Sequence, residues 1–81
     1  MTIDDIQRLL EAGLDGCEVQ VDEPVPGKFA VTVIGDVFAG LNRVKREQKA
    51  GAPLRDAILD GRIHAVSYRT FTPDEWAERG A

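Results

Sequence analysis

The sequence has very little of the residues that usually carry covalent or metal chemistry: of its 81 residues, one is cysteine and one is histidine. With Cys17 alone, no disulfide forms within one copy of the chain, and no cage of several thiolates can hold a metal ion. We therefore expect a protein of a reducing compartment, the cytoplasm. His64 alone provides neither a complete metal site nor a catalytic triad.

Long apolar runs are also missing. No stretch approaches the roughly 20 apolar residues of a membrane-spanning helix. Residues 1–13 alternate charged and apolar side chains instead of placing a basic start before a long apolar run, so we expect no signal peptide. No glycine-rich phosphate loop occurs, and no nucleophile stands beside a base. The sequence thus predicts neither a membrane protein nor an enzyme.

Basic residues are fewer than acidic ones, 10 against 14, and the net charge is −4. This balance argues against tight nucleic-acid binding through charge alone, because Lys and Arg supply most of that affinity. Residues 43–49 are a local exception, with four cations and one anion. Two interpretations stay open for them: a helix that contacts phosphates, or a solvated face with Arg43 paired to Glu47. The nucleic-acid contacts predicted by the first interpretation are Asn42, Arg43, Lys45, Arg46 and Lys49.

A helix and a hairpin are predicted for the first half of the chain. Apolar residues recur at helical spacing over about residues 3–12, with Thr2 as the capping residue and Gly13 as the end. Residues 17–22 alternate apolar and polar side chains, as a half-buried strand does. The segment DEPVPG breaks this strand, and the β-branched run KFAVTVIG predicts a central strand that pairs with it in a hairpin.

The second half begins with two helices. From Phe38 the period becomes helical: Leu41, Val44 and Gln48 fall on one side, and the cations spread over the other, which we expect to face solvent. Pro53 suits the first position of a second helix, which ends at the Asp-Gly pair a few residues later. Both helices therefore lie between the second and third strands.

The third strand covers about residues 62–70, and a capping box formed by Thr72 and Glu75 opens a short last helix. The resulting order is αββααβα. The two helices between the second and third strands form a crossover long enough to make those strands parallel. We therefore predict a single domain, residues 1–81, of the α/β (α+β) class. It has a mixed three-stranded sheet with helices on one face.

This topology predicts the surroundings of the single histidine. Parallel strands start at the same end of a sheet, so His64 is expected near Lys28. Cys17 begins the antiparallel strand at the far end and faces inward, on the order of 15 Å or more away. With Ile63 and Ala65 facing the helices, alternation points His64 and Tyr68 outward. On the residues alone, His64 is a partly exposed strand residue.

The run RIHAVSYRTFTPDEW, preceded by VFAGLNRVKREQ in the same element order, resembles the BolA family, in particular its short acid-stress-type bacterial members. The resemblance implies a fold like the class II KH domain. It also implies pairing with a monothiol glutaredoxin and a [2Fe–2S] cluster held jointly with glutathione, in which the histidine matching His64 is an iron ligand. Imidazole can replace thiolate in such a cluster. Family members are also described as transcriptional regulators, so DNA binding stays open as the alternative function. Without a partner, we expect the protein to be a monomer.

Two segments depart from the pattern of the family. The loop between the first two strands usually supplies a second ligand, His or Cys, but residues 22–28 contain neither, and Lys28 stands near that place. Asp22 and Glu23 are carboxylates, which are poor ligands for an iron–sulfur cluster. A KH domain grips nucleic acid with a GxxG loop between two helices. Here the junction KAGAP lacks the second glycine, so RNA binding of the KH type is not expected.

Overall fold

The computed structural model describes residues 1–79, so the last two positions of the expected domain lie outside it. The predicted αββααβα order is confirmed, with two 3₁₀ turns added to it. The elements are α1 (Ile3–Gly13), β1 (Glu18–Val25), β2 (Lys28–Ile34), the 3₁₀ turn η1 (Asp36–Phe38), α2 (Arg43–Gly51), the 3₁₀ turn η2 (Ala52–Leu54), α3 (Arg55–Leu59), β3 (Ala65–Phe71) and α4 (Pro73–Glu78). None of the helices within residues 1–79 is long and apolar enough to cross a membrane.

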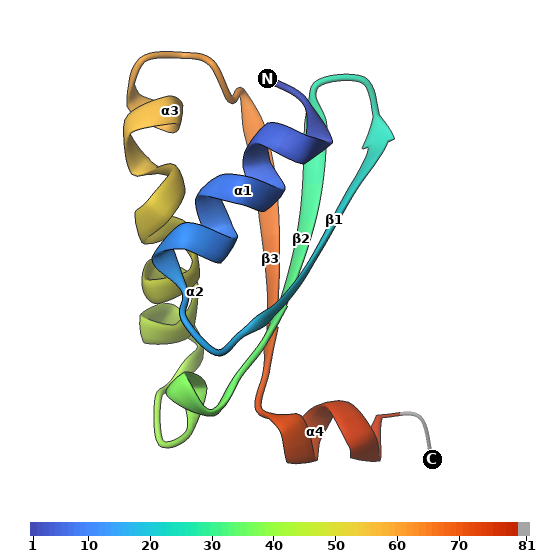
Figure 1. Cartoon of the computed structure of the whole chain (residues 1–81), viewed down its shortest axis with the longest axis vertical. Helices are drawn as coiled ribbons and strands as arrows, with labels where there is room; N and C mark the ends of the chain where they lie inside the picture. The colour runs from blue at the N-terminus through green and yellow to red at the C-terminus, as the bar shows by residue number, and fades with distance from the viewer. Residues whose placement is uncertain (80–81) are drawn as a thin grey trace.

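The sheet has the predicted topology. β2 is the central strand of three and pairs antiparallel with β1 and parallel with β3. Between β1 and β2 the chain reverses at a tight turn in which Gly27 has a φ of 81°, a conformation that suits glycine. The parallel register pairs Lys28 with Ala65 and Ile34 with Phe71. Helices α1, α2 and α3 lie on one side of the sheet, and α4 lies beyond the end of β3 (Figure 1).

The core fills the space between the sheet and the helices. Phe29, Val31 and Val33 alternate along β2 with less buried residues and face the helices. Ile6 and Leu10, one helical turn apart in α1, pack in the same cluster. Removal of this apolar surface from water, at about 25 cal/mol per Å², is the main term that holds the two layers together. The remaining core residues are Leu14, Val19, Phe38, Ala50, Leu54, Ala57 and Ile63.

Both predicted helix caps are present, and each forms a capping box. The N–H of Asp5 donates to Oγ1 of Thr2 at 3.1 Å, and the N–H of Thr2 donates to Oδ2 of Asp5 at 2.9 Å. Thr72 and Glu75 make the same pair of bonds at the start of α4. Each box satisfies two N–H groups that would otherwise lack a helical partner. The second box also fixes the change of direction after β3.

The third strand starts later than predicted, at Ala65, and this reverses the face assigned to Tyr68. Ile63 is buried, but it lies in the loop before the strand and is out of phase with the alternation inside it. Within β3, Val66 and Tyr68 pack against the core. The prediction that Tyr68 points away from the helices is therefore wrong, whereas His64 is exposed as predicted.

The inward side of α2 also differs from the prediction. Val44 is 61% exposed and Gln48 is exposed, whereas Ala50 is buried. Gly51 has no side chain, and a Cβ placed on it would lie 3.0 Å from the hydroxyl oxygen of Tyr68. Small residues at the end of the helix thus allow α2 to approach β3 closely, so this side of the helix faces the sheet. Helical structure then continues through η2 into α3 without an intervening loop.

Candidate metal-binding site

The backbone of His64 is held by fixed structure on both sides. Ile63 is only 3% exposed, and its N–H donates to the carbonyl oxygen of Ala57 at 3.1 Å. Immediately before it, Nε of Arg62 donates to the two carboxylate oxygens of Asp60 at 3.0 and 2.8 Å. The residue after His64 begins β3. These anchors place His64 at the head of the strand as part of an ordered loop.

Lys28 and His64 lie at the same end of the sheet, as predicted, because Lys28 pairs with Ala65, the residue that follows the histidine. The turn between β1 and β2 lies at this end too (Figure 1). In that turn, the N–H of Gly27 donates to Oε2 of Glu23 at 2.9 Å, so this carboxylate helps to close the hairpin. The exposed imidazole therefore shares its end of the sheet with a lysine and a carboxylate.

The side chains of the described residues do not complete a metal site by themselves. Within residues 1–79, no group of three or more His, Cys, Asp or Glu side chains could hold a metal ion. The carboxylate oxygens near the hairpin suit hard cations such as Mg²⁺ or Ca²⁺, whereas imidazole nitrogen suits iron. The donor set at this end of the sheet therefore fits a single nitrogen ligand to an iron–sulfur cluster whose other ligands come from elsewhere.

Cys17 is not part of this end of the sheet. It precedes β1, which begins opposite Ile34, and Ile34 is at the other end of β2 from Lys28. The side chain packs against the core, and burial raises the pKa of the thiol. A protonated, inward-facing thiol is a poor nucleophile and a poor metal ligand. The predicted separation of Cys17 from His64 is confirmed by the strand register.

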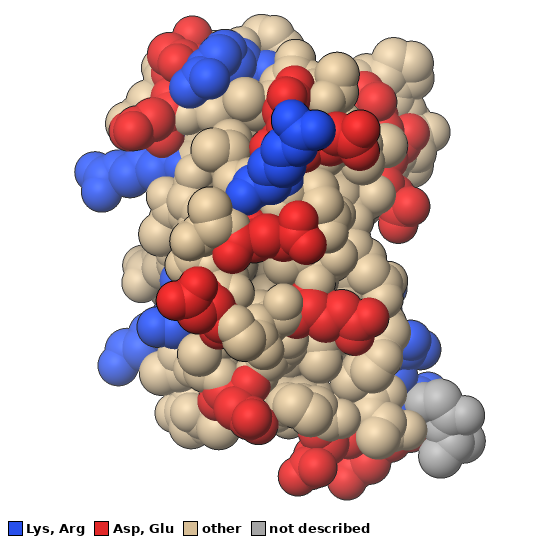
Figure 2. Space-filling view, in the orientation of Figure 1, with Lys and Arg blue, Asp and Glu red and all other residues tan. Residues whose placement is uncertain are grey.

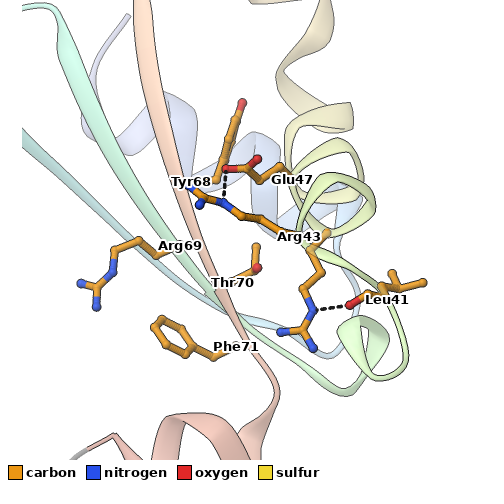
Figure 3. Close-up of a pocket in the computed structure, with 8 residues that line it drawn as sticks. Leu41, Arg43, Glu47, Tyr68, Arg69, Thr70 and Phe71 are labelled. Atoms are coloured by element: carbon orange, nitrogen blue, oxygen red, sulfur yellow. Dashed lines mark hydrogen bonds and ion pairs between the residues drawn. The ribbon is translucent and has the colours of Figure 1, made fainter.

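The residues predicted to contact nucleic acid do not form one open face. Lys45 and Lys49 are exposed, as expected. Arg43 is exposed as well, but its Nε lies 3.8 Å from Oε1 of Glu47, the pair that the solvated-face interpretation predicts (Figure 3). The N–H of Lys45 donates to Oδ1 of Asn42 at 2.9 Å, so the side chain of Asn42 caps α2. Three cations are left on the surface of the helix.

Arg46 is turned inward, so placing it among the solvent-facing cations is wrong. Its side chain is 16% exposed, and its two terminal nitrogens donate to the carboxylate of Glu75 at 2.6 and 3.3 Å. Its Nε also donates to the carbonyl oxygen of Leu41 at 2.9 Å. This contact links α2 to α4 and lowers the pKa of Glu75. No local pattern indicates the pair, because 29 positions separate its members.

One face of the molecule carries many acidic side chains. On the face seen in Figure 2, acidic side chains are spread from top to bottom, and Lys and Arg side chains lie near the top and at the left and right margins. A nucleic acid would meet repulsion over much of this face.

A hollow between α2 and β3 has no counterpart among the features predicted from the sequence (Figure 3). Its volume is about 350 Å³. Tyr68 is one of the residues in its wall, and the hydroxyl oxygen of Tyr68 is buried without a hydrogen-bond partner among residues 1–79. No pattern along the chain indicates this hollow, because only the crossover brings α2 and β3 together. The residues that line it are Leu41, Arg43, Arg46, Glu47, Tyr68, Arg69, Thr70 and Phe71.

Several known proteins are similar to this chain in sequence. The acid stress protein IbaG of Escherichia coli is 42% identical over 77 residues, which make up 95% of this chain and 90% of that protein. The DNA-binding transcriptional regulator BolA of Vibrio cholerae is 38% identical over 50 residues, which make up 62% of this chain and 46% of that protein.

Solved structures and a family model agree with these relatives. The fold superposes on a BolA protein homologue from Coxiella burnetii with a TM-score of 0.79 and 29% identity, covering 95% of this chain and 97% of that one. For BolA1 from Arabidopsis thaliana the TM-score is 0.77 at 26% identity, with 90% and 93% covered. Residues 18–75 match the family model described as BolA-like protein. This chain therefore belongs to the BolA-like protein family.

Proposed function

We propose that this protein is a cytoplasmic, non-catalytic adaptor that pairs with a monothiol glutaredoxin. Together the two proteins hold a [2Fe–2S] cluster with glutathione, and His64 supplies one ligand to it. The pair acts in iron–sulfur trafficking or in iron- and redox-linked regulation. Alone, the adaptor is a monomer.

The observation that carries this proposal is the position of His64. Its imidazole is exposed, while the residues before and after it are fixed by Ala57 and by the β2–β3 pairing. A nitrogen ligand held this way is ready for a metal centre carried by a second protein, and little conformational entropy is lost on binding. When bound, imidazole in place of thiolate on one iron raises the reduction potential of a [2Fe–2S] cluster.

Lys28 supports the same assignment. It is exposed and lies beside the head of β3, where its ammonium group favours an anionic partner. Glutathione carries two carboxylates, and a cluster ligated by thiolates is also anionic. This end of the sheet therefore offers one ligand and one cation to a negatively charged surface.

The test is to mix the protein with a glutaredoxin that carries its cluster and glutathione, and to record visible absorption and circular dichroism. The parent protein should change the spectrum of the cluster. His64→Ala removes the nitrogen but alters no buried contact, so it should fold normally and leave the spectrum as it is for the glutaredoxin alone. Cys17→Ser is the matched control and should behave as the parent does. A normal heterocomplex spectrum from His64→Ala would contradict the proposal.

DNA binding is the second candidate function, favoured by the exposed side chains of Arg43, Lys45 and Lys49 on α2. The Vibrio cholerae relative is named as a DNA-binding transcriptional regulator. Three cations on a chain with a net charge of −4 can supply only a small electrostatic contribution. We rank this function second for that reason, and its test is the dependence of binding on salt.

A further inference from the structure

The two outer edges of the sheet, on β1 and β3, differ in how far other parts of the chain block them. An exposed strand edge presents unpaired N–H and C=O groups that can recruit another strand, and proteins usually block such edges. On β1 the edge is blocked: Nε2 of Gln7 donates to the carbonyl oxygen of Val19 at 2.8 Å. The pairing of β1 is also irregular between Asp22 and Val25, and Pro24 has no N–H to offer.

The edge of β3 has no such protection. The N–H of Gly35 donates to the carbonyl oxygen of Phe71, so Phe71 and alternate residues before it direct their backbone groups toward β2. The backbone groups of Tyr68 and Thr70 therefore point away from the sheet. No backbone bond outside the β2–β3 ladder reaches them within residues 1–79. Both residues line the hollow of about 350 Å³ between α2 and β3.

The side chains around this edge indicate what could pair with it. Arg69 lies on the open face of the sheet, with its guanidinium carbon 5.4 Å from the centre of the Phe71 ring. The ion pairs within residues 1–79 leave Arg69 without an acidic partner. A strand added at the edge would place every second side chain on that face, beside Arg69. Acidic side chains would be stabilised there.

The other face of an added strand would meet apolar surface. A second hollow, of about 460 Å³, borders Tyr68 on the side of α3 and is lined in part by Ile58 and Leu59. Leu59 is 74% exposed, and Ile58 is partly exposed as well. Apolar side chains of the added strand would cover these residues and remove them from water. Tyr68 lines both hollows.

From this arrangement we infer that the free edge of β3 is a docking site for an extended segment of another protein, in which acidic and apolar residues alternate. The segment adds a fourth strand through the backbone groups of Tyr68 and Thr70. Its acidic side chains face Arg69, and its apolar ones face α3. This site goes beyond the proposed cluster site, because it is centred on the last residues of β3, whereas His64 precedes the first.

A second copy of the chain is a poor occupant for the same edge. Symmetric antiparallel pairing of two β3 strands through Tyr68 and Thr70 would set Arg69 directly opposite Arg69 of the other copy. Like charges at such a position are destabilising. The blocked edge of β1 cannot supply a head-to-tail partner either. The positive charge of Arg69 therefore favours binding of an acidic segment over pairing of two copies of the chain.

The test uses the full chain labelled with ¹⁵N and a blocked octapeptide of alternating valine and aspartate. At saturation, the peptide should slow amide hydrogen exchange at Tyr68 and Thr70 at least tenfold. The same peptide with lysine in place of aspartate should not bind. A version methylated on alternate backbone nitrogens cannot form the ladder and should not bind either. Binding of the methylated peptide with equal affinity would overturn the proposal, as would unchanged exchange with the first peptide.

Variants of the protein separate charge from backbone pairing. Arg69→Glu should weaken peptide binding about fivefold, since a favourable cross-strand pair becomes a repulsive one. The control Arg8→Glu makes the same charge change on α1 and should have less than a twofold effect. Thr70→Pro removes an outward N–H, which an edge strand tolerates, and should also weaken binding. Equal losses from Arg69→Glu and Arg8→Glu would show that only net charge matters.

Two further outcomes would assign the edge to another occupant and overturn the inference. Slowed exchange at Tyr68 and Thr70 that depends on protein concentration, without peptide, would mean that a second copy binds there. Slowed exchange with an oligothymidine, but not with the acidic peptide, would mean that single-stranded nucleic acid binds there.

Discussion

Cys17 fills the space in which Gly35 would carry a side chain: a Cβ placed on Gly35 would lie 2.5 Å from Sγ of Cys17. The φ of Gly35 is −173°, an extended conformation open to any residue, so glycine is required here by contact and not by backbone strain. Its N–H donates to the carbonyl oxygen of Phe71 at 2.9 Å, at the end of the β2–β3 pairing. The thiol is thus a packing group at the sheet end opposite His64.

Substitution of Gly35 by alanine should destabilise the fold. The new methyl group overlaps Sγ of Cys17, and overpacking of this kind costs about 1–3 kcal/mol. Cys17→Ala removes the sulfur and should recover most of the loss in the Gly35→Ala background, since the neighbour that then remains is a Cβ at 3.4 Å. Urea denaturation of the two single variants and the double variant measures this coupling. A double variant no more stable than Gly35→Ala would contradict the contact.

The ion pair between Arg46 and Glu75 should make stability depend on pH in mild acid. Its hydrogen bonds, together with those from Thr72, hold the pKa of Glu75 below the ordinary value of 4.5. A carboxylate with a lowered pKa in the folded state contributes stability that is present above pH 4.5 and is lost as the pH falls further. Glu75→Gln should therefore be less stable than the parent at pH 7 and should lose less stability on acidification.

Glu78→Gln is the matched control for that experiment. Glu78 lies in the same helix, is exposed, and belongs to none of the ion pairs within residues 1–79. At each pH from 7 to 3, the urea midpoint of this variant should stay close to that of the parent, because the pair between Arg46 and Glu75 is intact. If both variants gave the same pH profile, the link between α2 and α4 would contribute nothing measurable.

Local signals in the sequence account for most of the fold. Thr2 and Thr72 each precede an acidic residue by three positions, and both caps form as predicted because the bonds lie within one helical turn. The parallel pairing of β2 and β3 follows from the length of the crossover. The same pairing brings Lys28 and His64 to one end of the sheet, so their proximity is predictable from the order of the elements.

The features that the sequence does not predict depend on contacts between distant segments. Alternation assigns Tyr68 to the wrong face when Ile63 is taken as part of the strand, although Ala57 anchors Ile63 in the preceding loop. Arg46 resembles its basic neighbours along the helix, and only the folded chain brings Glu75 to it. From the sequence, a ligand role for His64 can be expected only through the family resemblance, because a lone histidine has no pattern that specifies its chemistry.

If α2 binds DNA, the three exposed cations should set the salt dependence of that binding. Replacing Arg43, Lys45 and Lys49 by glutamine should lower the slope of log K against log salt by about 0.9 for each phosphate that is no longer neutralised. Arg46 is left unchanged, because its substitution would break the pair with Glu75 and alter stability. Arg8→Gln, which removes a cation from α1, is the control. An unchanged slope in a titration of duplex DNA would mean that these cations contact no phosphate and that this side of α2 is only a solvated face.

The identity of the ligand atom at position 64 should set the properties of the shared cluster. In His64→Cys a thiolate takes the place of the imidazole, so this variant should still form a heterocomplex with a cluster-loaded glutaredoxin, unlike His64→Ala. Its reduction potential should be lower than that of the parent complex, because imidazole ligation raises the potential.

Spectroelectrochemical titration of the two complexes measures this difference in reduction potential. Lys28→Gln is a useful control, because it changes the charge beside the site but leaves the ligand in place. It should weaken the complex without changing the type of spectrum. Equal potentials for the parent and His64→Cys complexes would mean that residue 64 does not touch the cluster, and that the histidine serves the partner interface in some other way.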